Sequence, residues 1–234
     1  MEAPNTPVAD RYEILHGTDV TEAELADVIA LDQACFDSCY QVTALDDYQL
    51  FKSNPENGII IRDKTTGRLV AYSMLLPVRD EMYRRIRSGT FVDTDFRPDM
   101  SFKYGQPGIY HLYFASVVIH PDHRGARMVL TLLDAMVKDF IDLTSRGIFF
   151  ENMIADVVSR DGIKFCRLFG LTEVCRSNHD SFIYEVSALP PMLRVTTPTT
   201  RRLYDIYRAK FADEYGSEVD FLGERYLDEL RKED

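Results

Sequence analysis

The chain has 234 residues, 45% of them hydrophobic and 28% charged, which is an ordinary globular composition. Asp and Glu outnumber Lys and Arg by 38 to 27, and this disfavours a general binder of nucleic acid or of anionic membranes because those partners require clustered positive charge. No apolar run resembling a signal peptide opens the sequence and no 18-residue apolar stretch could span a bilayer, so we expect a cytoplasmic protein.

Two helices and a hairpin are predicted in the first third of the chain. Thr21–Phe36 follows a Thr cap with acidic residues in its first turn and apolar residues at helical spacing. Leu45–Lys52 indicates a second helix, which ends before the breaker at 54–58. The β-branched runs 59–62 and 69–78 flank a polar turn and predict a hairpin.

The middle of the chain alternates strands and helices. Tyr110–Ile119 is strand-like and Pro121 closes it, while Met128–Leu143 keeps the clearest 3.6-residue apolar rhythm in the sequence. The elements expected after them are a strand at Ile148–Val158, a helix at Gly162–Phe169 and a strand at Ser181–Val186. This order predicts the α/β (α+β) class, with a mixed sheet and helices on its faces.

Two stretches do not fit that compact pattern. Residues 80–108 form a long polar insertion that contains several aromatic residues, of the kind that acts as a lid or shapes a specificity pocket. Residues 190–234 begin with a Pro-Pro break and contain helical patterns at Thr200–Tyr215 and Val219–Leu230. We therefore expect one domain over 1–189 and a C-terminal helical extension over 190–234.

The most informative segment passes from strand through a small-residue loop into the clearest helix, between Val117 and Leu130. A strand-to-helix turn brings unpaired backbone N–H groups and the positive end of the helix dipole to one point, which suits a pyrophosphate. An ordinary turn with a basic surface would give the same pattern.

This segment resembles the acyl-CoA-binding motif of the GNAT superfamily of N-acyltransferases, a loop of Arg or Gln, two residues, Gly, one residue, then Gly or Ala. Arg124 takes the first position, whereas Arg127 and Val129 stand where the small residues are expected, so the copy is degenerate. A bare backbone can approach phosphate closely, and Gly125 and Ala126 partly compensate from neighbouring positions. The resemblance implies CoA contacts from Arg124, Gly125, Ala126, Arg127, Met128 and Val129.

A second match lies between Ser159 and Leu171 and resembles the later motif of the same family, in which an Asn opens a short helix, a Tyr lies on it and a Gly-Phe pair ends it. Gly170 and Leu171 correspond to that pair, which places Ser159 at the Asn and Cys166 at the Tyr. A generic helix with a Gly cap would look similar, but both motifs occur in the expected order. The resemblance covers about residues 12–187 and implies a mixed, mostly antiparallel central sheet with helices on both faces.

The resemblance also implies an activity, in which acetyl-CoA or another acyl-CoA is the co-substrate and a small-molecule or peptide amine attacks the thioester directly. Backbone N–H groups of Val117, Val118 and Ile119 would meet the acyl-pantetheine arm, with CoA in a gap between the strand ending at Ile119 and the strand beginning near Ile148. The amine acceptor and the acyl chain stay open, and so does a homodimer.

The candidates for proton transfer follow from the same positions. Cys166 replaces the Tyr that protonates the leaving thiolate, and Tyr113 stands where many relatives carry a Glu base. His111 lies two residues earlier on the same strand face and has a pKa range suited to amine deprotonation, so it is the preferred base. Glu151, near the start of the next strand, is the alternative and would act through water.

Two further interpretations concern ligands and activity. The four cysteines, at 35, 39, 166 and 175, lack zinc-knuckle spacing, and His120 and His123 lie within the loop without a cysteine or second acidic cluster, so no metal is assigned. The substitutions in both motifs keep a second hypothesis open, a catalytically retired GNAT-like module that binds acyl-CoA or a protein partner.

Overall fold

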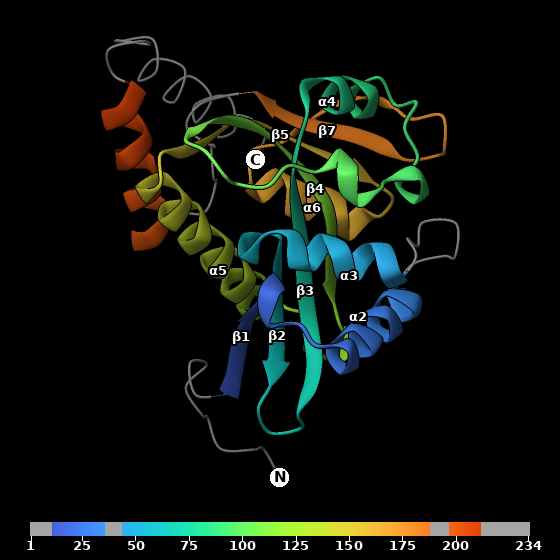
Figure 1. Cartoon of the computed structure of the whole chain (residues 1–234). Helices are drawn as coiled ribbons and strands as arrows, with labels where there is room; N and C mark the ends of the chain where they lie inside the picture. Colours follow the sequence, from blue (N-terminus) through green and yellow to red (C-terminus); the bar gives the residue numbers. More distant parts are fainter. Residues whose placement is uncertain (1–10, 36–43, 188–196, 212–234) are drawn as a thin grey trace.

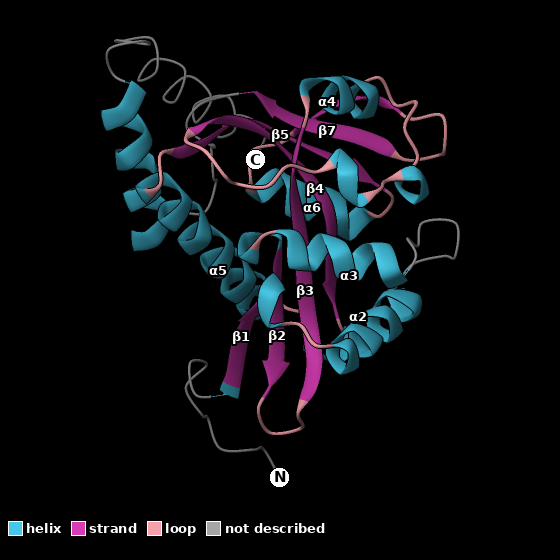
Figure 2. Cartoon of the chain, viewed as in Figure 1, coloured by secondary structure: helices cyan, strands magenta, loops and turns pink. Residues whose placement is uncertain are grey.

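A single mixed sheet forms the centre of the molecule in the computed structural model, which describes residues 11–35, 44–187 and 197–211 (Figures 1 and 2). The strands are β1 (Tyr12–His16), β2 (Gly58–Asp63), β3 (Arg68–Val78), β4 (Gly108–Ile119), β5 (Ile148–Val157), β6 (Thr172–Arg176) and β7 (Phe182–Ser187). They lie in the order β1-β2-β3-β4-β5-β7-β6. Neighbouring strands run antiparallel except for the parallel pair β4–β5, which confirms the predicted mixed and mostly antiparallel sheet.

Helices cover both faces of the sheet. They are α2 (Glu22–Cys35), α3 (Ala44–Ser53), α4 (Asp80–Arg87), α5 (Ala126–Ser145), α6 (Arg160–Leu168) and a helix over 198–211. The buried residues of α2, α3 and α4 belong to one apolar cluster, and those of α5, α6 and the 198–211 helix belong to another on the opposite face (Figure 1). None of the described helices is long and apolar enough to cross a membrane.

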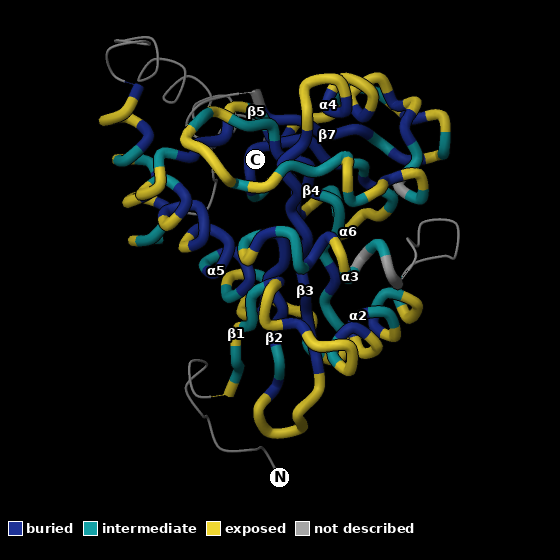
Figure 3. The backbone as a smooth tube through the Cα atoms, in the orientation of Figure 1, coloured by how far each residue is buried: buried dark blue, intermediate teal, exposed yellow. Residues whose placement is uncertain are grey.

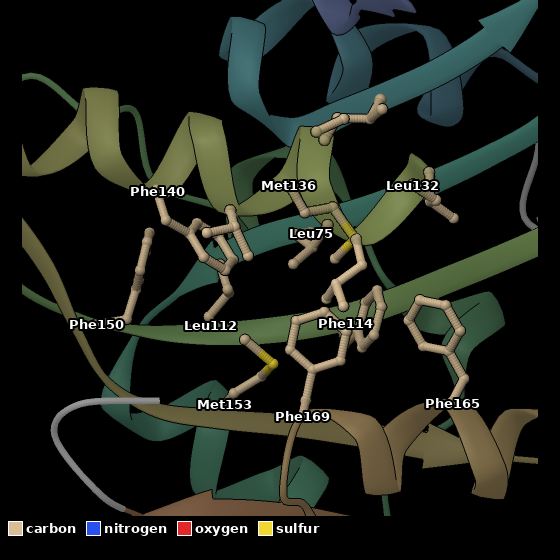
Figure 4. Packing of buried hydrophobic residues seen from close by; sticks show 14 of the residues in the cluster. Leu75, Leu112, Phe114, Leu132, Met136, Phe140, Phe150, Met153, Phe165 and Phe169 are labelled. Atoms are coloured by element: carbon tan, nitrogen blue, oxygen red, sulfur yellow. The ribbon is translucent and has the colours of Figure 1, made fainter. Parts of the chain in front are cut away.

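The larger cluster explains the strong helical signal in α5. Leu132, Met136 and Phe140 recur along one face of the helix and pack toward Leu112 and Phe114 of β4 (Figure 4). All five side chains are buried, and the tube in Figure 3 has the colour of buried residues along much of β3 and β4. Burying a side chain of this size stabilises the fold by about 1.5–3 kcal/mol, so the periodic face fixes α5 on the sheet.

The predicted boundaries agree with the local hydrogen bonds. At the start of α2 the Glu24 N–H donates to Thr21 Oγ1 over 3.4 Å and the Thr21 N–H donates to Glu24 Oε2 over 2.6 Å, which is a capping box. In the β2–β3 hairpin, Gly67 has a φ of +70° and donates its N–H to the Asp63 carbonyl over 2.7 Å. A left-handed residue favours glycine, so this turn explains the Gly in the predicted loop.

Three elements were not predicted. Strands β1 and β6 are short and lie at the two edges of the sheet, where side chains such as Ile14, 38% exposed, face solvent and the apolar alternation is lost. Helix α4 lies within the predicted insertion, and its charged residues conceal a buried stripe of Met82, Tyr83 and Ile86. The first part of the insertion therefore packs on the sheet.

The C-terminal helical pattern is described over 198–211, while the pattern at Val219–Leu230 lies outside the described residues. Leu203, Tyr207 and Phe211 are buried in the larger cluster. The buried Phe150 N–H of β5 donates to Tyr207 Oη over 2.9 Å. This helix is thus part of the main core.

Candidate functional site

Strands β4 and β5 separate at their carboxyl ends. Their parallel pairing runs from Gly108 and Ile148 to Phe114 and Ala155, after which β4 continues to Ile119 without a further pair on β5. The ladder is therefore not continuous, as the predicted gap requires. Because β4 leads into α5 and β5 leads into α6, the beginnings of both helices follow this gap.

Both strands contain an irregular pair, which lies beside the gap in β4 and near the first residues of the strand in β5. Ser73 and Met74 of β3 pair with Val117 and Ser116, but Leu75 pairs with Phe114, so Ala115 is an extra residue in β4. Such a bulge bends the strand and changes the direction of neighbouring side chains. In β5 the extra residue is Glu151, whose side chain is exposed.

A cavity of about 120 Å³ lies where the strands separate. Its lining includes residues of the α5–α6 face, namely Phe114, Ala155, Val157, Phe165 and Cys166, and residues of the opposite face, namely Leu50, Tyr72, Met74, Leu76, Phe96 and Tyr113. The cavity thus crosses the sheet. A molecule entering between the strands from one face could meet a second molecule entering from the other.

The loop between β4 and α5 leaves the helix end open toward an anion. Gly125 has a φ of +154° and a ψ of 166°, and within the described residues no side chain caps the helix. The first helical bond runs from the Val129 N–H to the Gly125 carbonyl over 3.2 Å, and the backbone N–H groups before Val129 lie at the positive end of the helix. This geometry suits a phosphate group.

The predicted CoA contacts in this loop differ in what they present. Arg124 donates from Nε to the Ile119 carbonyl over 3.2 Å, and its Nη1 lies 3.9 Å from Asp161 at the start of α6, so the half-exposed guanidinium sits beside the gap. Arg127 is exposed, whereas Met128 is buried and could offer only its backbone to a ligand.

Across the described residues, no group of three or more His, Cys, Asp and Glu side chains could hold a metal ion.

The second motif forms α6 and one wall of the cavity. Ser159 caps the helix by accepting the Gly162 N–H over 3.0 Å, and both residues line the cavity. A Cβ added to Gly162 would lie 2.9 Å from Val157 Cγ1, so glycine permits the close approach of helix and strand. Burial raises the pKa of the Cys166 thiol to about 12. Thiols ordinarily have a pKa near 8.5, so Cys166 is a weaker acid than the thiol of CoA. Transfer of its proton to a CoA thiolate would therefore be unfavourable.

The other predicted catalytic residues lie in different surroundings. Tyr113 lines the cavity, is 1% exposed and stacks on Phe96 with ring centroids 5.8 Å apart. His111 stacks on Tyr83 at 4.5 Å, its Nδ1 lies 3.1 Å from the Asn152 amide and its Nε2 lies 3.6 Å from Asp80. Neither His111 nor Glu151 is part of the cavity lining, whereas Val117, Ser159 and Cys166 are.

Polar residues that the sequence did not single out line the same cavity. Ser116 Oγ donates to Tyr72 Oη over 3.1 Å, and Tyr72 Oη donates to Asp32 Oδ1. Burial raises the pKa of Asp32 and also that of Asp156, whose Oδ1 is buried without a hydrogen-bond partner among the described residues. Asp32 lies one turn after the buried Val28, so an acid at a core-facing helical position was the available signal.

Solved structures provide the comparison, because no family model and no curated protein matches the sequence. The loading GNATL domain of CurA from Lyngbya majuscula is 13% identical with a TM-score of 0.52, over 75% of this chain and 97% of that chain. The GphF GNAT-like decarboxylase in complex with isobutyryl-CoA is 12% identical with a TM-score of 0.54, over 75% and 98%. This chain has the GNAT fold. In this GNAT fold the cavity lies where β4 and β5 separate, at the gap in which the sequence resemblance placed acyl-CoA, whereas residues 124–129 of the α5 turn do not line it.

Proposed function

We propose that the protein is an acyl-CoA-dependent N-acyltransferase that transfers an acyl group, in the first instance acetyl, to an amine. The observation that carries this proposal is the cavity that crosses the sheet where β4 and β5 separate. Because residues of both sheet faces line this cavity, a thioester could approach from one face and an amine from the other. Direct acyl transfer requires the thioester carbonyl and the amine nitrogen to lie next to each other.

The acyl-CoA side is supported by the geometry around α5. The N–H groups of the first turn and the Arg124 guanidinium would receive the pyrophosphate, and the edge of β4 that faces away from β3 at Val117, Val118 and Ile119 would receive the pantetheine amides. One structure of similar fold, the GphF decarboxylase, holds isobutyryl-CoA. We assign the same class of ligand to this cavity.

The reaction requires a neutral amine, stabilisation of a developing oxyanion and protonation of the departing thiolate. Two phenols, Tyr72 and Tyr113, line the cavity, and Tyr72 donates its proton to Asp32. We therefore assign proton donation to Tyr113, in preference to Cys166, whose raised pKa makes it a poor acid. His111 and Glu151 would need connecting water, since neither lines the cavity. The base is therefore better sought among the carboxylates that do.

The domain division follows from the same assignment. Residues 1–189 would form the acyltransferase domain, and the insertion over 80–108 would supply part of the acceptor wall through Phe96. Its other large rings have structural contacts, since Phe91 and Tyr83 are buried in the core and Tyr104 packs on Phe150. Residues 190–234 would form an extension whose described helix stabilises the domain.

The test has two stages. Calorimetry with CoA and acetyl-CoA should give saturable binding and a raised melting temperature, because a ligand at 100 times its Kd stabilises the folded state by about 2.7 kcal/mol. Release of free thiol is then followed with a panel of primary amines. Binding with turnover supports the transferase, binding without turnover supports the retired acyl-CoA-binding module, and failure to bind CoA contradicts both.

A further inference from the structure

Three hydroxyl and carboxyl groups form a directed chain along one wall of the cavity. Ser116 Oγ donates to Tyr72 Oη over 3.1 Å, and Tyr72 in turn donates to Asp32 Oδ1. Each O–H bond therefore points from the gap between β4 and β5 toward the carboxylate on α2. The lone pairs of Ser116 Oγ are then available to accept a hydrogen bond from a molecule in the cavity.

The charge of the cavity selects what that molecule can be. Its charged lining residues are Asp32 and Asp156, and among the described residues no Lys, Arg or His belongs to the lining. Most of the remaining wall on this face is apolar and includes Leu50, Met74, Leu76 and Phe96, with the ring of Tyr113 beside them. A cation with a hydrocarbon substituent satisfies both properties, since an anion would meet two acids and a highly polar chain would lose its hydration.

We propose, resting on the proposed function, that the acceptor is a small primary alkylammonium ion whose proton leaves through Ser116 and Tyr72 to Asp32. The ammonium donates its proton to Ser116 Oγ, the Ser116 proton moves to Tyr72 Oη, and the Tyr72 proton moves to Asp32. The neutral nitrogen forms a bond to the thioester carbonyl carbon and the C–S bond breaks. Tyr113 then gives its phenolic proton to the CoA thiolate and takes up the second proton of the nitrogen, and Asp32 returns the first proton to solvent.

The size of the cavity limits the acceptor. At about 120 Å³ it is smaller than an engineered apolar cavity of about 150 Å³ that accommodates benzene. A short alkyl chain would occupy the part of it beside Leu50, Met74 and Leu76, with any longer part extending into solvent. The acyl end of the thioester enters from the other face, past Phe114 and Cys166.

Asp32→Asn and Tyr72→Phe are the decisive variants, with butylamine as the cationic acceptor and aniline, uncharged at neutral pH, as the comparator. The matched controls are Asp27→Asn, an exposed position on the same helix, and Tyr110→Phe, whose hydroxyl donates to the Gln106 carbonyl outside the cavity. Loss of the relay should lower kcat/KM for butylamine about 10²–10⁴-fold. Transfer to aniline should fall much less, because aniline has no ammonium proton to lose before attack.

The pH profile separates this role from a structural one. Activity of Asp32→Asn toward butylamine should recover as the pH rises, because the free amine then forms in solution. The other titratable groups that line the cavity, Tyr72, Tyr113, Asp156 and Cys166, are unchanged in this variant. Equal losses for butylamine and aniline, or full activity of both variants, would overturn the proposal.

A binding measurement distinguishes this proposal from the proposed function. Butylammonium is titrated calorimetrically into the protein saturated with CoA, and in parallel into the protein alone. At least a tenfold weaker affinity for Asp32→Asn than for Asp27→Asn supports the acceptor site even if no acyl transfer occurs. Equal affinity refutes the site even if CoA binds and another amine is acylated.

Discussion

Phe114 of β4 and Ala155 of β5 are the last pair of residues at which the two parallel strands lie side by side. Beyond them the strands diverge, and each continues into a helix. A glycine with a structural role lies at or near the start of each helix. Gly125 adopts a backbone conformation that glycine alone tolerates well, and Gly162 permits close contact with Val157. The backbone thereby supplies an opening in the sheet and two helix ends beside it, and side chains complete the site.

The first prediction concerns the charge beside this opening. Arg124→Glu should weaken CoA binding about 10- to 100-fold, because a charge-assisted hydrogen bond worth about 1.5–3 kcal/mol is replaced by repulsion. Arg124→Gln should lose less, since Gln keeps a donor. Calorimetry with CoA measures both, and the exposed Arg202→Glu on the 198–211 helix controls for net charge. Wild-type affinity in Arg124→Glu would remove this residue from the site.

The second prediction concerns the backbone of the same loop. A Cβ at Gly125 would meet nothing within 4 Å, so Gly125→Ala acts only through its φ of +154°. The strain costs about 1–3 kcal/mol and should displace the first turn of α5, which weakens CoA binding.

Gly67→Ala in the β2–β3 turn is the matched control, because Gly67 also has a positive φ, +70°, and open space around it. It should lower the melting temperature without changing the Kd for CoA. Equal effects of both variants on CoA affinity would show that the loop backbone is not a ligand contact.

Elements that bury a regular apolar face could be predicted from the sequence, and elements whose signal depends on distant partners could not. The side chains of α5 repeat with the helical period because the helix lies on the sheet along its length. Strand β1 and strand β6 each have one neighbour, and β1 reaches its partner β2 only after more than 40 intervening residues. Local propensity contains little information about such edges.

The site shows the same division. The turn between β4 and α5 could be predicted because its residues are consecutive in the sequence. The hydrogen-bonded chain of Ser116, Tyr72 and Asp32 could not, because it joins three elements that are adjacent only after folding. His111 has suitable chemistry for a base, but Tyr83 of the insertion stacks on its ring. The packing of α4 could not be inferred while 80–108 was read as a polar loop.

The third prediction tests whether the insertion shapes the acceptor side. Phe96 lines the cavity, whereas Phe91 is equally buried beside it and does not line it. Phe96→Leu should raise the KM for the amine several-fold and leave the Kd for CoA unchanged, because it alters one wall of the cavity. Phe91→Leu should show a comparable loss of stability with an unchanged amine KM. A raised KM in both variants, or in neither, would contradict the assignment.

The fourth prediction concerns Asp156. Burial raises the pKa of Asp156 above the ordinary carboxyl value of about 3.9, so the folded state binds a proton more tightly than the unfolded state. The stability linked to the protonated form is complete below that value and is lost as the pH rises through the folded pKa. Asp156→Asn removes this dependence, and its free energy of unfolding relative to wild type should increase between about pH 4 and about pH 7.

Urea unfolding at both pH values checks the Asp156 prediction, with the exposed Asp142→Asn on α5 as the control for one lost charge. Asp142→Asn should differ little from wild type at either pH. A relative stability of Asp156→Asn that stays constant, or declines as the pH rises, would show that the carboxyl is not destabilised by burial.

The last prediction tests the connection between the C-terminal helix and the sheet. Tyr207 is 1% exposed, and its hydroxyl accepts the N–H of Phe150, which is 3% exposed. Tyr207→Phe keeps the ring packed against Phe149 but leaves a buried N–H without an acceptor, at a cost of about 1–3 kcal/mol. Tyr110→Phe removes a hydroxyl near the surface and should cost less than about 0.5 kcal/mol. Urea unfolding gives both values, and hydrogen exchange at the Phe150 amide should accelerate in Tyr207→Phe alone. If the two variants were equally stable and that amide stayed protected, the 198–211 helix would not be held to β5 through this bond.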